Sequence, residues 1–278
     1  MINLEGGEMI FSEKIRTAWL KNNSLVCVGL DPDLEKVPEP LRSSQAPLFE
    51  FNRVIIEATA DLVCAYKPQM AFYAAVGLER DLEMTIAYVH EKHRDIPIIL
   101  DAKRGDIGST AELYAREVFD RYGADAVTVN PYLGGDSLDP FLKRRDKGII
   151  ILCRTSNPGA TDLQDLEVKG EKLYRIVARK AAGEWNRNGN VLLVVGATYP
   201  QELGEIRALV GDMPFLVPGI GAQGGDIERA VSNGKTQDGT GMIINSSRGI
   251  IYAEEGKNFG QAARVAALRL RDEINRYR

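Results

Sequence analysis

The sequence predicts an α/β fold in which eight parallel strands and eight helices form a single (β/α)8 TIM barrel. Three observations support this prediction. Short apolar runs recur along the chain, segments with helical spacing separate them, and a length of 278 residues suits one large barrel better than two full-sized domains. Strictly alternating strands and helices favour a barrel over an open sheet, although counting elements does not prove closure.

The predicted strands are short runs rich in β-branched residues. Each run is apolar throughout instead of alternating with polar residues, which is typical of parallel strands covered on both faces. The runs occupy residues 25–30, 62–66, 97–100, 126–129, 148–152, 191–195, 215–217 and 242–244.

The segments between these runs have the apolar spacing of helices that pack on a sheet. No linker, internal repeat or low-complexity tract divides the chain, so we expect residues 1–278 to form one domain, with 1–10 as a flexible N-terminal extension. The predicted helices occupy residues 46–61, 78–93, 111–121, 137–145, 168–186, 201–210, 226–232 and 259–277, and a leading helix occupies 12–21.

Two predicted connections are longer than the few residues usual in such a fold. Residues 154–166 follow the fifth strand, and the glycine-rich residues 217–225 follow the seventh. Loops at the carboxyl ends of barrel strands commonly hold binding and moving parts, so we expect both loops to border the functional site.

Composition narrows the class of partner and the compartment. The chain has 35 Lys and Arg against 39 Asp and Glu, without a block of like charges, so neither a nucleic-acid partner nor a membrane surface is indicated. No stretch reaches the roughly 18 apolar residues of a membrane span, and residues 1–8 lack the pattern of a signal peptide. Three cysteines without a CxxC motif are expected to be buried, reduced thiols, so we predict a cytoplasmic protein.

The most informative motif is LDAKRGDIGST at residues 100–110, where the third strand ends. Asp101 and Lys103 are two residues apart on chain expected to be extended, so their side chains should point to the same side, into the barrel mouth. Asp106 follows after the turn. Two carboxylates beside one ammonium would keep Lys103 protonated and ready to donate a proton. A surface cluster of salt bridges at a strand end is the alternative interpretation.

Two further charges follow neighbouring strands. Asp31 comes at the end of the first predicted strand and Lys67 at the end of the second. Each alone is typical of a solvated loop. Because the carboxyl ends of all barrel strands lie on one face, however, these charges should converge with those of the 100–110 motif, as a catalytic site requires.

A phosphate site is predicted where the seventh and eighth strands end. The sequences VPGIGAQGG at 217–225 and NSSRGI at 245–250 combine glycines, which let the backbone approach an anion, with the fixed charge of Arg248. Barrel enzymes commonly bind phosphate at this place. A flexible loop without a ligand is the alternative, and the spacing does not fit a dinucleotide-binding fingerprint.

Metal and serine-based chemistry are not predicted. The two histidines, His90 and His93, lie on one predicted helix among charged residues, as on a solvated face. Ser156, Ser246 and Ser247 have no evident base beside them, which argues against a nucleophilic serine.

Taken together, several motifs resemble orotidine 5′-phosphate decarboxylases from about residue 11 to the C-terminus, and LCRTSNP at 152–158 resembles the longer bacterial, type 2 branch of that family. The matching segments are GLDP at 29–32, YKP at 66–68, DAKRGD at 101–106, NPYLG at 130–134, PGIGAQGG at 218–225 and SRG at 247–249.

The resemblance implies decarboxylation of orotidine 5′-monophosphate to UMP, in pyrimidine biosynthesis, by a homodimer that uses no metal or organic cofactor. It implies that Lys103 protonates C6, that Asp101 lies near the substrate carboxylate, and that Lys67 and Asp106 complete the charge network. The chemistry agrees with these residue types, because loss of CO2 leaves a carbanion without a conventional electron sink, and fixed charges with a nearby ammonium can stabilise it.

The resemblance also implies substrate-binding residues in both subunits. These are Asp31 and Lys67 at the ribose, Ser156 at the pyrimidine, Gln223 and Arg248 at the phosphate, Pro218, Gly221 and Gly249 elsewhere around the substrate, and Asp106, Ile107 and Thr110 reaching in from the neighbouring subunit.

Two alternatives remain open from the sequence. A sugar-phosphate decarboxylase of the same superfamily shares the DxKxxD pattern but resembles a magnesium enzyme with an acidic residue after the second strand, where this chain has Lys67. A cation at that position disfavours metal binding. The other alternative is a barrel that binds a phosphorylated ligand without turnover.

Overall fold

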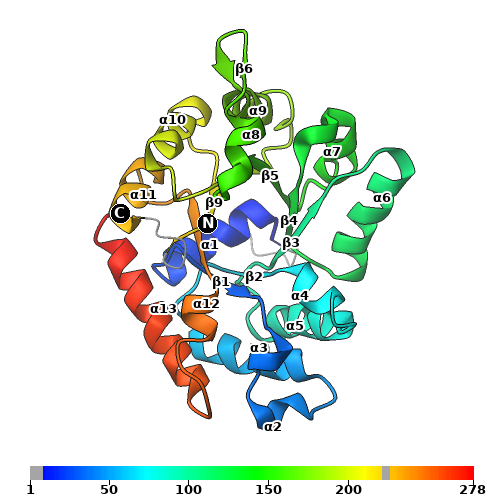
Figure 1. Cartoon of the computed structure of the whole chain (residues 1–278), viewed down its shortest axis with the longest axis vertical. Helices are drawn as coiled ribbons and strands as arrows, with labels where there is room; N and C mark the ends of the chain where they lie inside the picture. Colours follow the sequence, from blue (N-terminus) through cyan, green and yellow to red (C-terminus); the bar gives the residue numbers. More distant parts are fainter. Residues whose placement is uncertain (1–8, 221–225) are drawn as a thin grey trace, which may run out of the picture.

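The computed structural model describes residues 9–220 and 226–278. Within these residues, one sheet contains eight parallel strands in the order β2-β1-β10-β9-β8-β5-β4-β3. Isolated parallel bridges between Tyr66 and Ile98 and between Gln69 and Asp101 join the two ends of that order. The sheet therefore closes into the predicted barrel, with the helices arranged around it (Figure 1).

All eight predicted strands are confirmed. Two of them are displaced. The third spans Ile99–Arg104 instead of residues 97–100. The second begins at Ala65 instead of residue 62, because the Leu62 N–H still donates to the Thr59 carbonyl in the turn that ends the preceding helix. The strands are β1 Val26–Leu30, β2 Ala65–Pro68, β3 Ile99–Arg104, β4 Ala126–Val129, β5 Gly148–Arg154, β8 Val191–Val195, β9 Phe215–Val217 and β10 Met242–Ser246.

The predicted helices are also confirmed, with one error described below. A short π-helical turn, Glu117–Arg121, continues α6. The helices are α1 Phe11–Lys21, α3 Pro47–Thr59, α5 Glu79–Lys92, α6 Gly108–Arg116, α7 Gly135–Leu142, α9 Leu173–Ala182, α10 Pro200–Val210, α11 Ile227–Gly234 and α13 Phe259–Asn275.

The helix predicted over 168–186 is wrong at its start. β6, Glu167–Val168, and β7, Glu171–Lys172, form an antiparallel hairpin there, and α9 begins only at Leu173. The hairpin turn contains Lys169 and Gly170, both with positive φ (55° and 80°). Such a two-residue turn matches the twist of the paired strands and interrupts a helix.

Helix α1 covers the amino-terminal end of the barrel. The Phe11 N–H donates to the Asp146 carbonyl, just before β5. A Cβ on Gly148, the first residue of β5, would lie 2.5 Å from the Phe11 ring. The glycine thus lets the aromatic ring close this end of the core.

The opposite end carries short elements that the sequence did not predict. They follow the carboxyl ends of strands, where the site is expected. They are α2 Glu39–Arg42, α4 Met70–Ala74, α8 Thr161–Gln164, α12 Arg248–Ile251 and the 3-10 turns η1 Leu34–Lys36, η3 Pro131–Leu133 and η4 Pro158–Ala160.

The core is mainly apolar, as the unbroken hydrophobic runs predicted. Every residue of β1 and of β8 is buried. Cys27, Cys64 and Cys153 are buried free thiols, which confirms that prediction. None of the helices in the described residues is long and apolar enough to cross a membrane.

Candidate active site

Four charged side chains alternate in sign at the carboxyl ends of β1, β2 and β3. Lys67 Nζ lies 3.0 Å from Asp101 Oδ2 and 4.0 Å from Asp31 Oδ1. Lys103 Nζ lies 2.7 Å from Asp101 Oδ1. The structure therefore brings together Asp31, Lys67, Asp101 and Lys103, which the sequence predicted to converge; we call them the ionic array.

The local backbone that joins Asp101 to Lys103 differs from the predicted extended chain. Leu100 pairs with Val127 and Arg104 with Val129, so β3 bulges between these pairs. Lys103 has φ 46°, in the left-handed region that a residue with a long side chain rarely adopts. The two side chains meet as predicted, but the backbone between them is bulged, so the predicted regular extended chain is wrong here. Strain of this kind is typical of functional sites.

Thr128 of β4 supports the bulge. Its hydroxyl accepts a hydrogen bond from the Lys103 N–H (2.9 Å) and donates one to Asp101 Oδ1 (2.8 Å). Sequence reasoning missed Thr128. Its signal was a single polar residue in the otherwise apolar strand AVTV.

Opposite charges at short range control ionisation within the array. Burial alone would raise the pKa of Asp101, but Lys67 and Lys103 outweigh it and hold that pKa well below its ordinary value. Burial alone would likewise lower the pKa of Lys67, but Asp101 and Asp31 outweigh it and raise that pKa. Both groups are therefore charged at neutral pH, and their field is present before a substrate arrives.

Asp31 is held where β1 meets β2 and β10. Its Oδ1 accepts a hydrogen bond from the Gln69 N–H at 3.1 Å. A Cβ on Gly29 would lie 2.7 Å from Ser247 Cβ and 3.0 Å from Asp31 Oδ2. Glycine at position 29 therefore permits the close approach of the two strand ends that places Asp31 beside Lys67.

Asp106 stands apart from the array of its own chain. Over the described residues, no ion pair joins it to Lys103; Asp106 Oδ1 instead accepts a hydrogen bond from the Ile107 N–H at 2.8 Å. Ile107, 59% exposed, and Thr110 lie at the start of α6 and face solvent. Within one chain, the predicted cluster thus contains Asp101 but not Asp106.

The predicted phosphate residues are described only in part. Gly221 and Gln223 lie outside the described residues. Pro218 follows β9, and the exposed Arg248 and Gly249 open α12 after β10. Because β9 and β10 are neighbours, Pro218 and Arg248 belong to adjacent loops on one side of the barrel mouth.

Ser156, the predicted pyrimidine contact, follows β5 and packs against Gly196 after β8. A Cβ on Gly196 would lie 2.9 Å from Ser156 Cβ and 3.1 Å from Ser156 N. The Gly196 N–H also donates to the Arg154 carbonyl at 2.8 Å. Sequence reasoning missed Gly196. The signal that could have found it is its position, since it is a glycine directly after the apolar run of β8.

The first prediction concerns Asp101, the shared counter-charge of the array. Asp101→Asn should lower the free energy of unfolding at pH 7 by about 3 kcal/mol, because it leaves buried Lys67 without its nearest carboxylate. The pKa of Asp101 is lower in the folded protein than in the unfolded chain, where it is about 4. The ionised carboxylate therefore stabilises the fold above about pH 4, and this contribution is lost as the pH falls below that value. Urea unfolding between pH 3 and 7 should therefore show a shallower acid decline for Asp101→Asn than for wild type; parallel declines would contradict the prediction.

A closed parallel barrel with a preorganised ionic array at the carboxyl ends of its strands defines an enzyme of the (β/α)8 class. Within the described ranges, no group of three or more His, Cys, Asp or Glu side chains is arranged to hold a metal ion. Comparison with known proteins then identifies the family.

Residues 24–263 match the model of the orotidine 5′-phosphate decarboxylase / HUMPS family. The orotidine 5′-phosphate decarboxylase of Dechloromonas aromatica is 61% identical over 97% of this chain and 100% of its own length. That of Cellvibrio japonicus is 60% identical over 96% of this chain and 98% of its own. The solved structure of Leishmania donovani OMP decarboxylase has a TM-score of 0.84 and 41% identity, covering 97% of this chain and 98% of that one. The chain belongs to the orotidine 5′-phosphate decarboxylase family.

Proposed function

We propose that this protein converts orotidine 5′-monophosphate to UMP and CO2 in pyrimidine biosynthesis. The observation that carries the proposal is the ionic array, in which Lys103 lies 2.7 Å from a carboxylate whose low pKa keeps it charged. Full-length relatives at 60–61% identity bear the name of this activity.

The reaction needs charge stabilisation and one proton. The bond from C6 to the carboxylate carbon breaks, CO2 leaves, and the electron pair remains on C6. Lys103 Nζ then donates a proton to C6 and regains one from solvent. The Asp101 carboxylate lies beside this ammonium and, in our proposal, near the substrate carboxylate, where repulsion favours departure of CO2.

We assign the remaining parts of the substrate to other predicted site residues. We assign the pyrimidine to Ser156 and the ribose hydroxyls to Asp31 and Lys67, which form the far end of the ionic array. We assign the phosphate to Arg248 and Gln223. Pro218, Gly221 and Gly249 complete the substrate contacts.

We further propose that the enzyme is a homodimer in which Asp106, Ile107 and Thr110 serve the site of the partner. Support comes from the absence of an ion pair between Asp106 and Lys103 in the described part of one chain. Large apolar side chains are also exposed on α6 and η3, among them Leu113 at 58% and Tyr132 at 77%. Burial of such side chains would favour association. Buried, unpaired cysteines support a cytoplasmic location.

The magnesium-dependent sugar-phosphate decarboxylase is a weaker candidate. An acidic metal ligand after the second strand would be needed, and Lys67 Nζ lies there between two carboxylates. An ammonium in that place repels a divalent cation.

Incubation of the purified protein with orotidine 5′-monophosphate, with UMP detected by chromatography, tests the proposal. Turnover should persist in EDTA. Turnover that vanishes with EDTA and returns with magnesium would contradict the cofactor-free mechanism. Tight nucleotide binding without any UMP would favour the non-catalytic alternative.

The second prediction concerns the phosphate. Arg248→Ala should cost roughly 2–5 kcal/mol in transition-state stabilisation, the scale for removing one partner of a desolvated charge pair. The measurement is kcat/KM by the UMP assay. Arg94→Ala is the matched control, because Arg94 is also exposed but precedes β3 at the other end of the barrel. An unchanged kcat/KM in Arg248→Ala would remove Arg248 from the phosphate site.

A further inference from the structure

We propose that Arg154 is a positioning residue for recognition of the substrate base: its buried guanidinium ties the loop that carries Ser156 to helix α10. This inference rests on the proposed function, because it takes Ser156 as the contact to the pyrimidine. Arg154 does not touch the substrate in our proposal and acts through Ser156.

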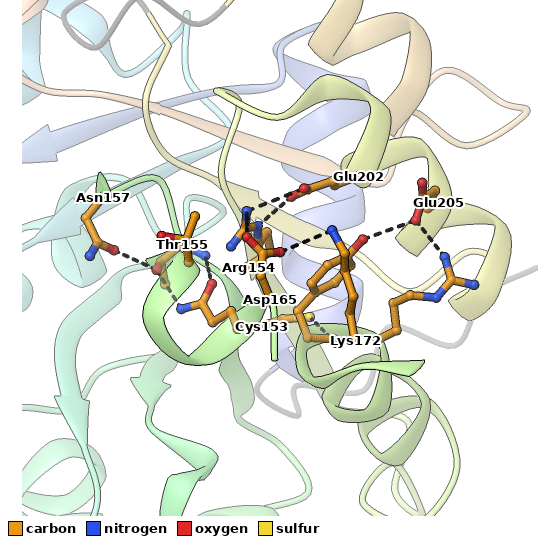
Figure 2. Close-up of polar contacts among 12 residues, drawn as sticks. Cys153, Arg154, Thr155, Asn157, Asp165, Lys172, Glu202 and Glu205 are labelled. Atoms are coloured by element: carbon orange, nitrogen blue, oxygen red, sulfur yellow. Dashed lines mark hydrogen bonds and ion pairs between the residues drawn. The ribbon is translucent and has the colours of Figure 1, made fainter. Parts of the chain in front are cut away.

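The Arg154 side chain is 1% exposed and has two carboxylate partners (Figure 2). Its Nε lies 2.5 Å from Glu202 Oε2 in the first turn of α10, and its Nη2 lies 3.2 Å from Asp165 Oδ2 in the loop after β5. The Tyr199 ring centroid lies 4.4 Å from the guanidinium carbon. One cation therefore joins two segments that are distant in sequence.

A bulge at the end of β5 directs Arg154 away from the barrel interior. Leu152 pairs with Val194, but Arg154 pairs with Val195, so Cys153 is an extra residue. Cys153 Sγ donates to the Tyr174 carbonyl of α9 at 3.2 Å. With this bulge, Arg154 reaches the layer between α9 and α10, and Ser156 follows two residues later at the barrel mouth.

The loop between Ser156 and Asp165 is closed on itself by side-chain hydrogen bonds (Figure 2). The Thr155 N–H donates to Gln164 Oε1 at 2.9 Å, and Gln164 Nε2 donates back to Thr155 Oγ1 at 2.8 Å. Thr155 Oγ1 donates to Asn157 Oδ1 at 2.7 Å. Asp165 follows Gln164, so Arg154 holds the start of this loop through the backbone and its end through an ion pair.

Ser156 is thus fixed from three directions. Gly196 packs behind it, the Thr155–Gln164 pair closes its loop, and Arg154 anchors that loop to α10. A buried ion pair is weak evidence for stability, because desolvation opposes the attraction, and the role we propose for this one is to specify a single arrangement of the loop and α10. The forked guanidinium can bind two carboxylates at once, which a lysine ammonium does less well.

The test compares two ligands that differ in the base. UMP contains the pyrimidine, whereas ribose 5-phosphate has only the sugar and phosphate. Arg154→Met should raise the inhibition constant of UMP about tenfold, the scale of one lost hydrogen bond, and leave that of ribose 5-phosphate within about twofold. General damage to the fold would weaken both ligands alike.

Three further variants provide a second test, a partial rescue and a control. Glu202→Gln retains shape but loses the ion pair, and it carries the test if Arg154→Met does not fold. Arg154→Lys should restore part of the UMP affinity. Arg207→Met is the matched control. Arg207 is a half-buried arginine in the last turn of α10 that donates to backbone carbonyls such as those of Gly241 and Met213, away from Glu202 in the first turn, so its loss should lower stability without changing the ratio of the two inhibition constants.

A double-mutant cycle shows whether Arg154 acts through Ser156. In the Ser156→Ala background, Arg154→Met should weaken UMP binding little further. Additive losses, or equal losses for both ligands in Arg154→Met and Glu202→Gln, would overturn the inference while the wild type still produces UMP. A wild type that neither produces nor binds UMP would instead overturn the proposed function.

Discussion

Lys103→Ala should abolish decarboxylation while nucleotide binding remains measurable. In the proposed mechanism the ammonium donates the proton to C6 and its charge stabilises the carbanion, and general acid catalysis alone contributes about 100- to 10,000-fold. The combined loss should therefore exceed about 1,000-fold in kcat. The proposed phosphate and base contacts come from loops after other strands, so UMP should still bind. Single-turnover UMP formation and UMP titration measure the two effects.

Lys103→Arg is the matched variant for this experiment. It keeps a positive charge near Asp101 but holds its proton too tightly to donate it. We expect it to bind nucleotide and to remain severely impaired in kcat. A Lys103→Ala enzyme that retained about a tenth of the wild-type rate would contradict the role of proton donor.

A mixture of inactive Lys103→Ala and Asp106→Ala subunits should recover activity after dissociation and reassociation. If Lys103 comes from one chain and Asp106 from the other, a mixed dimer contains one site with both lesions and one with neither. Random pairing of equal amounts should then restore about a quarter of the wild-type activity by the arithmetic of an isologous dimer.

The structure offers a control for this mixing experiment. Lys67 and Lys103 contact the same Asp101 of one chain, so a mixture of Lys67→Ala and Lys103→Ala subunits has a lesion in every site and should stay inactive. If the Asp106→Ala mixture also stays inactive, Asp106 serves its own chain and the shared site is wrong.

The sequence alone determined the barrel and the convergence of most of its charges. Unbroken apolar runs indicated strands such as β4 and β8 at their observed bounds, because burial on both faces leaves a local signal. Asp31, Lys67 and Asp101 could be placed together without coordinates, since parallel strands in a barrel end on the same face. The motifs around these charges also indicated the family.

Only the tertiary structure decided how those charges and the loop that carries Ser156 are held in place. The positive φ of Lys103 and the supporting hydroxyl of Thr128 depend on the pairing of β3 with β4. The contact of Ser156 with Gly196 and the ion pair of Arg154 with Glu202 join residues about 40 positions or more apart along the chain. Periodicity reports which face of an element is buried, whereas bulges and long-range ion pairs arise from packing between elements, which no local pattern records.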